Sequence, residues 1–245
     1  MKYNSSLRFL PIALLIISVG LMLFSCANMS RPSGGPKDET PPRYIKGNPS
    51  LNACNFNDKR IELEFDEIVQ VDKPSEKVII SPPQINMPKI QAQGKKVRIE
   101  LQDSLQPNTT YTIDFSDAIV DNNEKNPLKG FSLSFSTGPS LDSLQISGIL
   151  LNAENLEPIT GMLVGAYSNL DDSAFTTLPM ERVSSSDALG HFTIRNLKAN
   201  TPYRIFALKE ANRNYRFDAP TEDIAFLDTA FVSYAEPKQY ADTIY

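Results

Sequence analysis

Cys26 carries the side chain with the clearest chemistry in this sequence, because its thiol stands directly after an apolar leader. The leader opens with Lys2 and Arg8 and is largely apolar from residue 9 to residue 24. A charged start, an apolar run and a small residue before the cut are typical of a secretory signal peptide. The run is too short and too interrupted for a membrane span. We therefore predict cleavage after Ser25, so that residues 1–25 leave the mature protein.

The end of this leader, Leu23-Phe24-Ser25-Cys26, resembles the lipobox of bacterial lipoproteins. The resemblance implies that the Cys26 sulfur carries diacylglycerol, and that acyl chains such as palmitate hold the protein on a membrane. Ala27 follows the cysteine where inner-membrane retention would favour Asp, so the resemblance implies an outer-membrane lipoprotein, with surface exposure left open. An ordinary signal peptide, or an uncleaved anchor with a chance cysteine, is the alternative.

Residues 26–39 are rich in Pro, Gly and Ser and contain almost no apolar side chains. Such a segment cannot bury enough surface to offset the entropy lost on ordering, so we predict a flexible tether. The whole chain has a net charge of −5. Without Lys2 and Arg8 of the leader, the net charge becomes −5 − 2 = −7. This acidic balance argues against nucleic acid as a partner.

The other reactive side chains do not form a catalytic set. Cys54 has no partner if Cys26 is acylated, and its neighbours offer no base, so we expect a half-buried, inert thiol. His191 is the only histidine, and no Gly-x-Ser-x-Gly motif accompanies it. The acid pairs Asp171-Asp172 and Glu222-Asp223 lack an aromatic sugar platform, and the chain has no Trp. We predict no catalytic residues.

One segment has the spacing of oxygen ligands for a hard cation. Its four candidates alternate along the chain as in calcium loops: Glu210, Asn212, Asn214 and Asp218. Two arginines lie among them, no Gly supplies the sharp bend, and Thr221 stands where a calcium loop has its final acid. We therefore keep these four as weak metal candidates and assign neither a metal nor a cofactor.

Short runs of alternating apolar and polar residues dominate the chain beyond the tether. This period of two is typical of strands with one buried face, and turn residues separate the runs. The clearest runs are 60–66, 97–101, 111–115, 131–135, 146–150, 162–167, 192–194 and 203–208. No stretch of helical length has an apolar stripe. The pattern predicts an all-β protein of two consecutive β-sandwich domains after the signal peptide.

The first predicted domain, residues 40–138, resembles the bacterial Ig-like domain of S-layer proteins of the SbsA type. The matching motifs are Arg60 to Val69, Leu105 to Ile113, and Asp121 to Leu128 followed by Phe131 to Thr137. Glu124-Lys125 stands where the family usually has Gly, so that turn departs from the pattern. We also expect the Tyr111 hydroxyl to find a backbone acceptor, as in the tyrosine corner of sandwiches.

The second predicted domain, residues 139–245, resembles the carboxypeptidase-regulatory or transthyretin-like β-sandwich. The matching motifs are Ile146 to Leu150, Glu157 to Gly161, and Ser186 to Leu197 followed by Pro202 to Ile205. In 162–167 either alternating set can form the buried face, whereas 203–208 is apolar on both faces and is predicted to be a central strand. The domain is either incomplete or closed by a strand near residues 231–234.

These observations predict a lipid-anchored protein of the cell envelope that acts as a non-catalytic binding or scaffold module. Its partners would be the membrane, through the N-terminal lipid, and a glycan, a peptide or another envelope protein. Two alternatives stay open. The chain is a structural spacer of a longer lipoprotein whose functional part lies downstream, or, least favoured, an envelope hydrolase.

Overall fold

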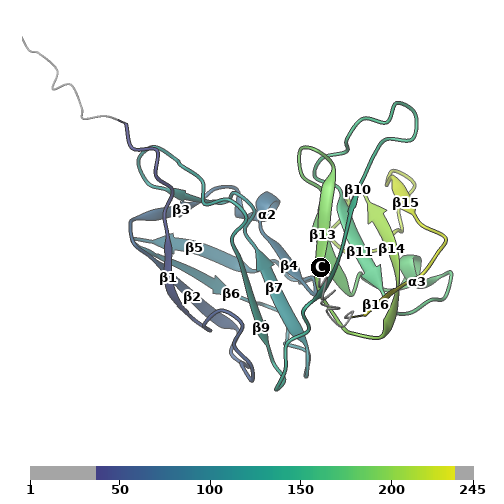
Figure 1. Ribbon diagram of the computed structural model, residues 1–245, viewed down its shortest axis with the longest axis horizontal. Coiled ribbons are helices and arrows are strands. Elements are labelled where there is room, and N and C mark those ends of the chain that lie inside the picture. Colours follow the sequence, from purple (N-terminus) through teal and green to yellow (C-terminus); the bar gives the residue numbers. More distant parts are fainter. Residues whose placement is uncertain (1–36, 235–245) are drawn as a thin grey trace, which may run out of the picture. The chain divides into compact units, whose positions relative to one another are not determined.

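The computed structural model describes residues 37–234, and Figure 1 follows their path from strand β1 to strand β16. The predicted leader, the Cys26 attachment site and most of the predicted tether lie outside these residues. The described residues from 39 onward belong to one compact unit. Within the described part of the chain, no helix is both long and apolar enough to cross a membrane.

The N-terminal half, which we define as residues 39–138, is built from two main sheets. One has the strand order β1-β2-β6-β5, the other has the order β4-β7-β9, and β3 pairs with β8 in a small ribbon. All the pairs between neighbouring strands are antiparallel. The strands are β1 (Tyr44–Asn48), β2 (Arg60–Phe65), β3 (Val69–Val71), β4 (Ile79–Ser81), β5 (Lys89–Gln93), β6 (Lys96–Glu100), β7 (Thr110–Asp114), β8 (Ile119–Asp121) and β9 (Ser132–Ser136).

The alternating residues of this half form one apolar core. Leu63, Ile113 and Phe135 are fully buried. The neighbours of Leu63, Glu62 and Glu64, are half-buried, whereas Thr112 and Ser136, beside Ile113 and Phe135, are buried themselves. The Tyr111 ring stacks on Phe135 with a centroid distance of 5.4 Å. Burial of large aliphatic and aromatic side chains stabilises each by about 1.5–3 kcal/mol, so this core supplies most of the driving force for folding.

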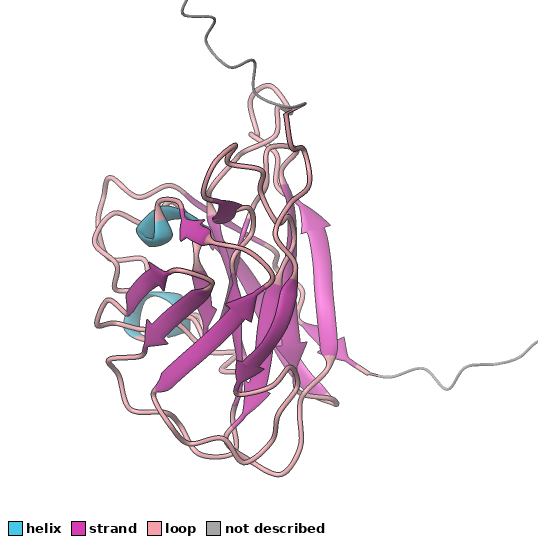
Figure 2. Cartoon of the chain, turned by 90° about the vertical axis from the view of Figure 1, so that its left-hand side faces the viewer, coloured by secondary structure: helices cyan, strands magenta, loops and turns pink. Residues whose placement is uncertain are grey.

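The C-terminal half, which we define as residues 139–234, also has two sheets. A two-stranded sheet, β10-β13, lies against the order β12-β11-β14-β15, and β16 also pairs with β14. Figure 2 shows how strands prevail over two single-turn helices, α2 (Pro74–Lys77) in the first half and α3 (Ala174–Thr177) in this one. The strands are β10 (Leu144–Ile149), β11 (Leu163–Tyr167), β12 (Arg182–Ser185), β13 (His191–Leu197), β14 (Thr201–Leu208), β15 (Ile224–Phe226) and β16 (Phe231–Ser233).

Strand β11 is covered on both faces, which explains why its sequence gave no preference between two alternating sets. Val164 and Ala166 belong to the core that faces β10-β13. Tyr167 and the half-buried Leu163 belong to a second apolar cluster on the opposite face. The predicted central position of residues 203–208 is confirmed, because β14 pairs with β11 on one side and with β15 and β16 on the other.

Both halves contain the same turn, which the sequence spells as Leu-x-x-Asn-Thr-x-Tyr at residues 105–111 and 197–203. The Asn of each copy has a positive φ, and each Tyr hydroxyl accepts a hydrogen bond from the backbone N–H five residues earlier. The N–H···O distance is 2.8 Å for Tyr111 and 3.2 Å for Tyr203. The expected corner is present, but the hydroxyl accepts from a backbone donor instead of donating to a backbone acceptor.

Cys54 is exposed, which corrects the expectation of a half-buried thiol. It lies in a turn between Asn52 and Asn55, both of which have positive φ. This turn directs Ala53 and Phe56 onto the core, and the side chain between them is left facing solvent.

Candidate binding cleft and the junction beside it

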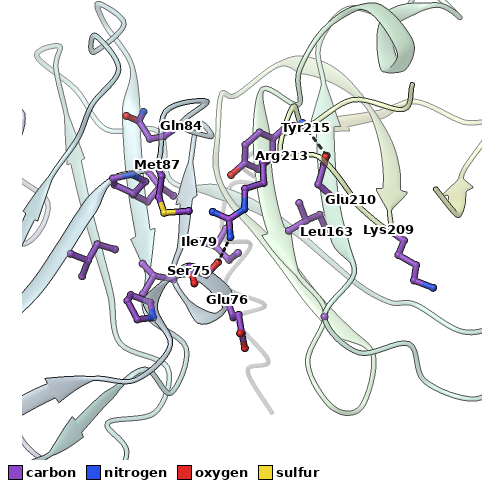
Figure 3. A pocket seen from close by; sticks show the side chains of 16 residues that line it. Ser75, Glu76, Ile79, Gln84, Met87, Leu163, Lys209, Glu210, Arg213 and Tyr215 are labelled. Carbon is purple, nitrogen blue, oxygen red and sulfur yellow. Dashed lines mark hydrogen bonds between the residues drawn. The ribbon is translucent and has the colours of Figure 1, made fainter. Parts of the chain in front are cut away.

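A cleft of about 520 Å³ lies between residues of the two halves. Figure 3 shows its labelled side chains, with Ser75, Ile79 and Met87 on one wall and Leu163, Arg213 and Tyr215 on the other. Its lining mixes apolar and charged groups, which suits recognition of a ligand with both kinds of surface.

The first wall is held by helix α2 and the strand that follows it. Pro74 begins the helix, where its missing N–H costs no hydrogen bond. Lys77 lies between two carboxylates, 2.9 Å from Asp72 and 3.1 Å from Asp117. Hydrogen bonds to these carboxylates raise the pKa of Lys77. The helix is therefore fastened to the sheet behind it, and Ser75 is left at the edge of the cleft.

The second wall is the loop that contains the four weak metal candidates. Glu210 accepts backbone N–H bonds from Asn212, Asn214 and Tyr215 at 3.0–3.2 Å. Asp218 accepts from the side-chain amide nitrogens of Asn212 and Asn214, which makes these groups donors here. The four residues are close together, but their hydrogen bonds hold the loop. Among the described residues, no group of three His, Cys, Asp or Glu side chains is placed to hold a metal ion.

This loop turns Arg213 and Tyr215 toward the cleft. Both have positive φ, at 65° and 59°, and the Glu210 carboxylate fixes the backbone between them. Arg213 donates from Nη2 to the Ser75 carbonyl at 3.2 Å, which links the two walls. Burial raises the pKa of Tyr215, so its hydroxyl stays protonated at neutral pH.

Beside the cleft, a buried junction joins the two halves through polar side chains. Arg182 is 5% exposed, and its Nη1 donates to the Thr110 carbonyl at 2.9 Å. Its Nη2 lies 3.7 Å from the Asp142 carboxylate, which in turn accepts from the Thr110 hydroxyl. Burial lowers the pKa of Arg182, and Tyr203 and Asp142 act against this effect. The backbone N–H of Val183 also donates to the Ser81 hydroxyl at 3.0 Å.

Asn196 makes the second set of contacts across the junction. Its positive φ of 58° lies next to a register shift between β10 and β13. Its Oδ1 accepts from the hydroxyls of Thr112 at 2.6 Å and Ser134 at 3.2 Å, and its Nδ2 donates to the Asp142 carbonyl at 2.6 Å. One amide side chain thus connects β13, two strands of the first half and the segment between the halves.

The other predicted positions lie apart from these features. His191 is exposed at the start of β13, with Nδ1 3.7 Å from the Asp187 carboxylate. Asp172 is exposed and pairs with Arg204 at 2.7 Å, while the buried Glu222 accepts backbone N–H bonds from residues 211, 218 and 219. None of these acids faces a second carboxylate across a shared substrate site in the described residues.

Sequence reasoning missed the residues of the junction and the role of Asp121. This buried carboxylate accepts backbone N–H bonds from four consecutive residues, 123–126, at 2.8–3.0 Å. The signal was present in Asp121-Asn122-Asn123, because Asp before a polar turn commonly accepts from the backbone that follows. For Arg182 no local signal exists, since its partners are far away in the sequence.

Comparisons agree with this all-β sandwich architecture. Residues 38–137 match the family described as the bacterial Ig-like domain. No curated protein matches the chain.

Similar solved structures include three with low identity. The N-terminal part of the bacterial S-layer protein SbsC is 13% identical, with 80% of this chain and 45% of that chain covered and a TM-score of 0.28. An L,D-transpeptidase from Mycobacterium smegmatis is 9% identical, with coverage of 64% and 77% and a TM-score of 0.28. The T6 backbone pilin of serotype M6 Streptococcus pyogenes is 10% identical, with coverage of 76% and 52% and a TM-score of 0.22. This chain thus spans less than half of the SbsC fragment.

Proposed function

We propose that this protein is a lipid-anchored, non-catalytic scaffold module of the bacterial cell envelope, in which the two halves act as one stiff body. The observation that carries the proposal is the buried junction. Arg182 and Asn196 cross between the halves, and the connecting residue Asp142 binds both of them. A connection of this kind resists bending, because a small displacement that does not admit water would leave a buried guanidinium and several polar groups without their partners.

The match to the bacterial Ig-like domain supports a structural role in the envelope. The N-terminal sequence supports the anchor, since Cys26 follows a secretory leader and a small residue. We place the protein at the outer membrane because Ala27, and not Asp, follows Cys26. The transthyretin-like relationship of residues 139–245 and the domain boundary at 138 belong to the same proposal.

Stiffness can be tested with two spin labels on the chain from residue 26 onward, with Cys26→Ser. Cys54 is a natural exposed thiol in the first half, and Thr229→Cys supplies an exposed one in the second. Pulsed electron paramagnetic resonance should give one narrow distance distribution between them. A broad or bimodal distribution would refute a stiff body.

The anchor has its own test, which uses the two cysteines as variant and control. Metabolic labelling with a palmitate analogue should mark the wild type and Cys54→Ala equally. Cys26→Ala should lose the label and accumulate as an uncleaved precursor. Equal labelling of Cys26→Ala and wild type would refute the lipid anchor while leaving the stiff scaffold untouched.

A further inference from the structure

Two turns at one end of the C-terminal half carry exposed aliphatic side chains. We define the tip as residues 149–159 and 187–191, two turns that lie at the same end of β10 and β13 in Figure 1. Four aliphatic side chains there are largely exposed: Ile149 at 57%, Leu151 at 43%, Leu156 at 71% and Leu189 at 63%. Single exposed aliphatic residues are ordinary on protein surfaces, whereas several on two joined turns are a feature from which an interaction surface can be inferred.

The two turns are held together, so the group is preformed. The Leu150 N–H donates to the Gly190 carbonyl at 2.8 Å, and residue 151 bridges to residue 158. The Asp187 carboxylate accepts from the N–H groups of Leu189 and His191, both at 2.8 Å. A surface that is already ordered loses little conformational entropy when a partner binds.

Leu156 is the most exposed of these four side chains. Its φ is 61°, a left-handed conformation that Gly or Asn adopts at lower cost than Leu. Its N–H donates to the Asn152 carbonyl at 2.9 Å, which fixes this geometry. Because its side chain is mostly exposed, core packing does not compensate for the strain. The turn therefore holds Leu156 in place and leaves its side chain exposed.

The charges around the tip define the partner. The two turns contain Glu154, Glu157 and Asp187 and neither contains Lys or Arg, although the imidazole of His191 lies 3.7 Å from the Asp187 carboxylate. Anionic lipid headgroups would be repelled by these carboxylates. We propose that the tip docks onto a partner protein whose contact surface is apolar at its centre and carries Lys or Arg at its rim.

The test uses the chain from residue 26 with Cys26→Ser and two fluorescent 14-residue amphipathic helical peptides as probes, one of Leu and Lys and one of Leu and Glu. Fluorescence anisotropy should show a Kd at least tenfold lower for the Leu/Lys peptide. The double variant Leu156→Ser, Leu189→Ser should raise that Kd at least tenfold. The control Ile45→Ser, Ile68→Ser removes aliphatic residues that are 56% and 52% exposed in the first half, and it should bind as wild type does.

A second double variant, Glu154→Lys with Glu157→Lys, separates loss of binding from loss of folding. It should bind the Leu/Glu peptide more tightly than the Leu/Lys peptide, and its melting temperature should equal that of the wild type. Three results would overturn the proposal. In the first, the Leu/Lys peptide binds equally to wild type and to the Leu156→Ser, Leu189→Ser variant. This result would mean that the cationic peptide is attracted only by the net negative charge of the protein. In the second, sedimentation shows a dimer that this variant abolishes, so that the occupant is a second copy. In the third, the tip binds anionic phosphatidylglycerol vesicles in place of the peptide.

Discussion

At the scale of single residues, several carboxylates in this protein stabilise backbone turns, and Asp121 is the clearest case. Burial raises the pKa of Asp121, but the four backbone N–H donors of residues 123–126 outweigh that effect and the pKa lies below its ordinary value of 3.8. The ionised carboxylate of Asp121 therefore stabilises the folded protein relative to the unfolded chain. Glu210, which the sequence suggested as a metal ligand, likewise accepts backbone N–H bonds and stabilises the loop beside the cleft.

We expect Asp121→Ala to lower the free energy of unfolding by about 2–4 kcal/mol, because it leaves several N–H groups without an acceptor. In the wild type, the contribution of this carboxylate is complete above the unfolded pKa of about 3.9 and is lost as pH falls through the lower folded pKa. Urea unfolding between pH 2.5 and pH 7 measures both effects. Asp121→Asn keeps an acceptor but should lose the pH-dependent part. An unchanged pH dependence in Asp121→Asn would count against this assignment.

At the scale of elements, the alternating patterns identified strands such as β2, β6 and β14, since a buried face repeats every two residues. They gave no expectation for the strands β1, β3, β4, β5, β8, β12 and β15. The predictions were weaker wherever a second layer covers a strand. In β11 both faces are buried, and Gly165 faces Met180 so closely that a Cβ there would lie 2.3 Å from the methionine Sδ. No local pattern reveals such a contact, because Met180 comes from another part of the chain. The same reason explains why the cleft and the junction were not foreseen.

Gly165→Ala should destabilise the protein by about 1–3 kcal/mol, since an added methyl group in a close-packed site forces neighbours to move. Met180 is 2% exposed, so Met180→Ala alone should also be costly. In the double variant the new methyl group occupies space that the methionine has left. Thermal or urea unfolding should therefore show a cost well below the sum of the two single costs. Simple additivity would mean that the contact is not a packing constraint.

At the scale of the whole molecule, the junction determines whether the halves behave as one body. We expect Arg182→Met to cost about 2–4 kcal/mol, because the Thr110 carbonyl and the Asp142 carboxylate lose their buried partner. The variant should also broaden the distance distribution between labels at Cys54 and Thr229→Cys. The matched control is Arg195→Met on β13, whose exposed side chain makes only a 3.4 Å hydrogen bond to Gln145. If Arg182→Met behaved as this control does, the junction would not couple the halves.

The junction also bears on how such a chain can change by recombination. Thr110, Thr112 and Ser134 come from the first half, while Arg182 and Asn196 come from the second. A foreign Ig-like module grafted onto residues 139–245 would face a buried guanidinium and a half-buried amide without acceptors and donors to match. The segment between the halves is therefore a poor crossover point. Substitutions at these five positions should instead appear together as correlated changes when related sequences are compared.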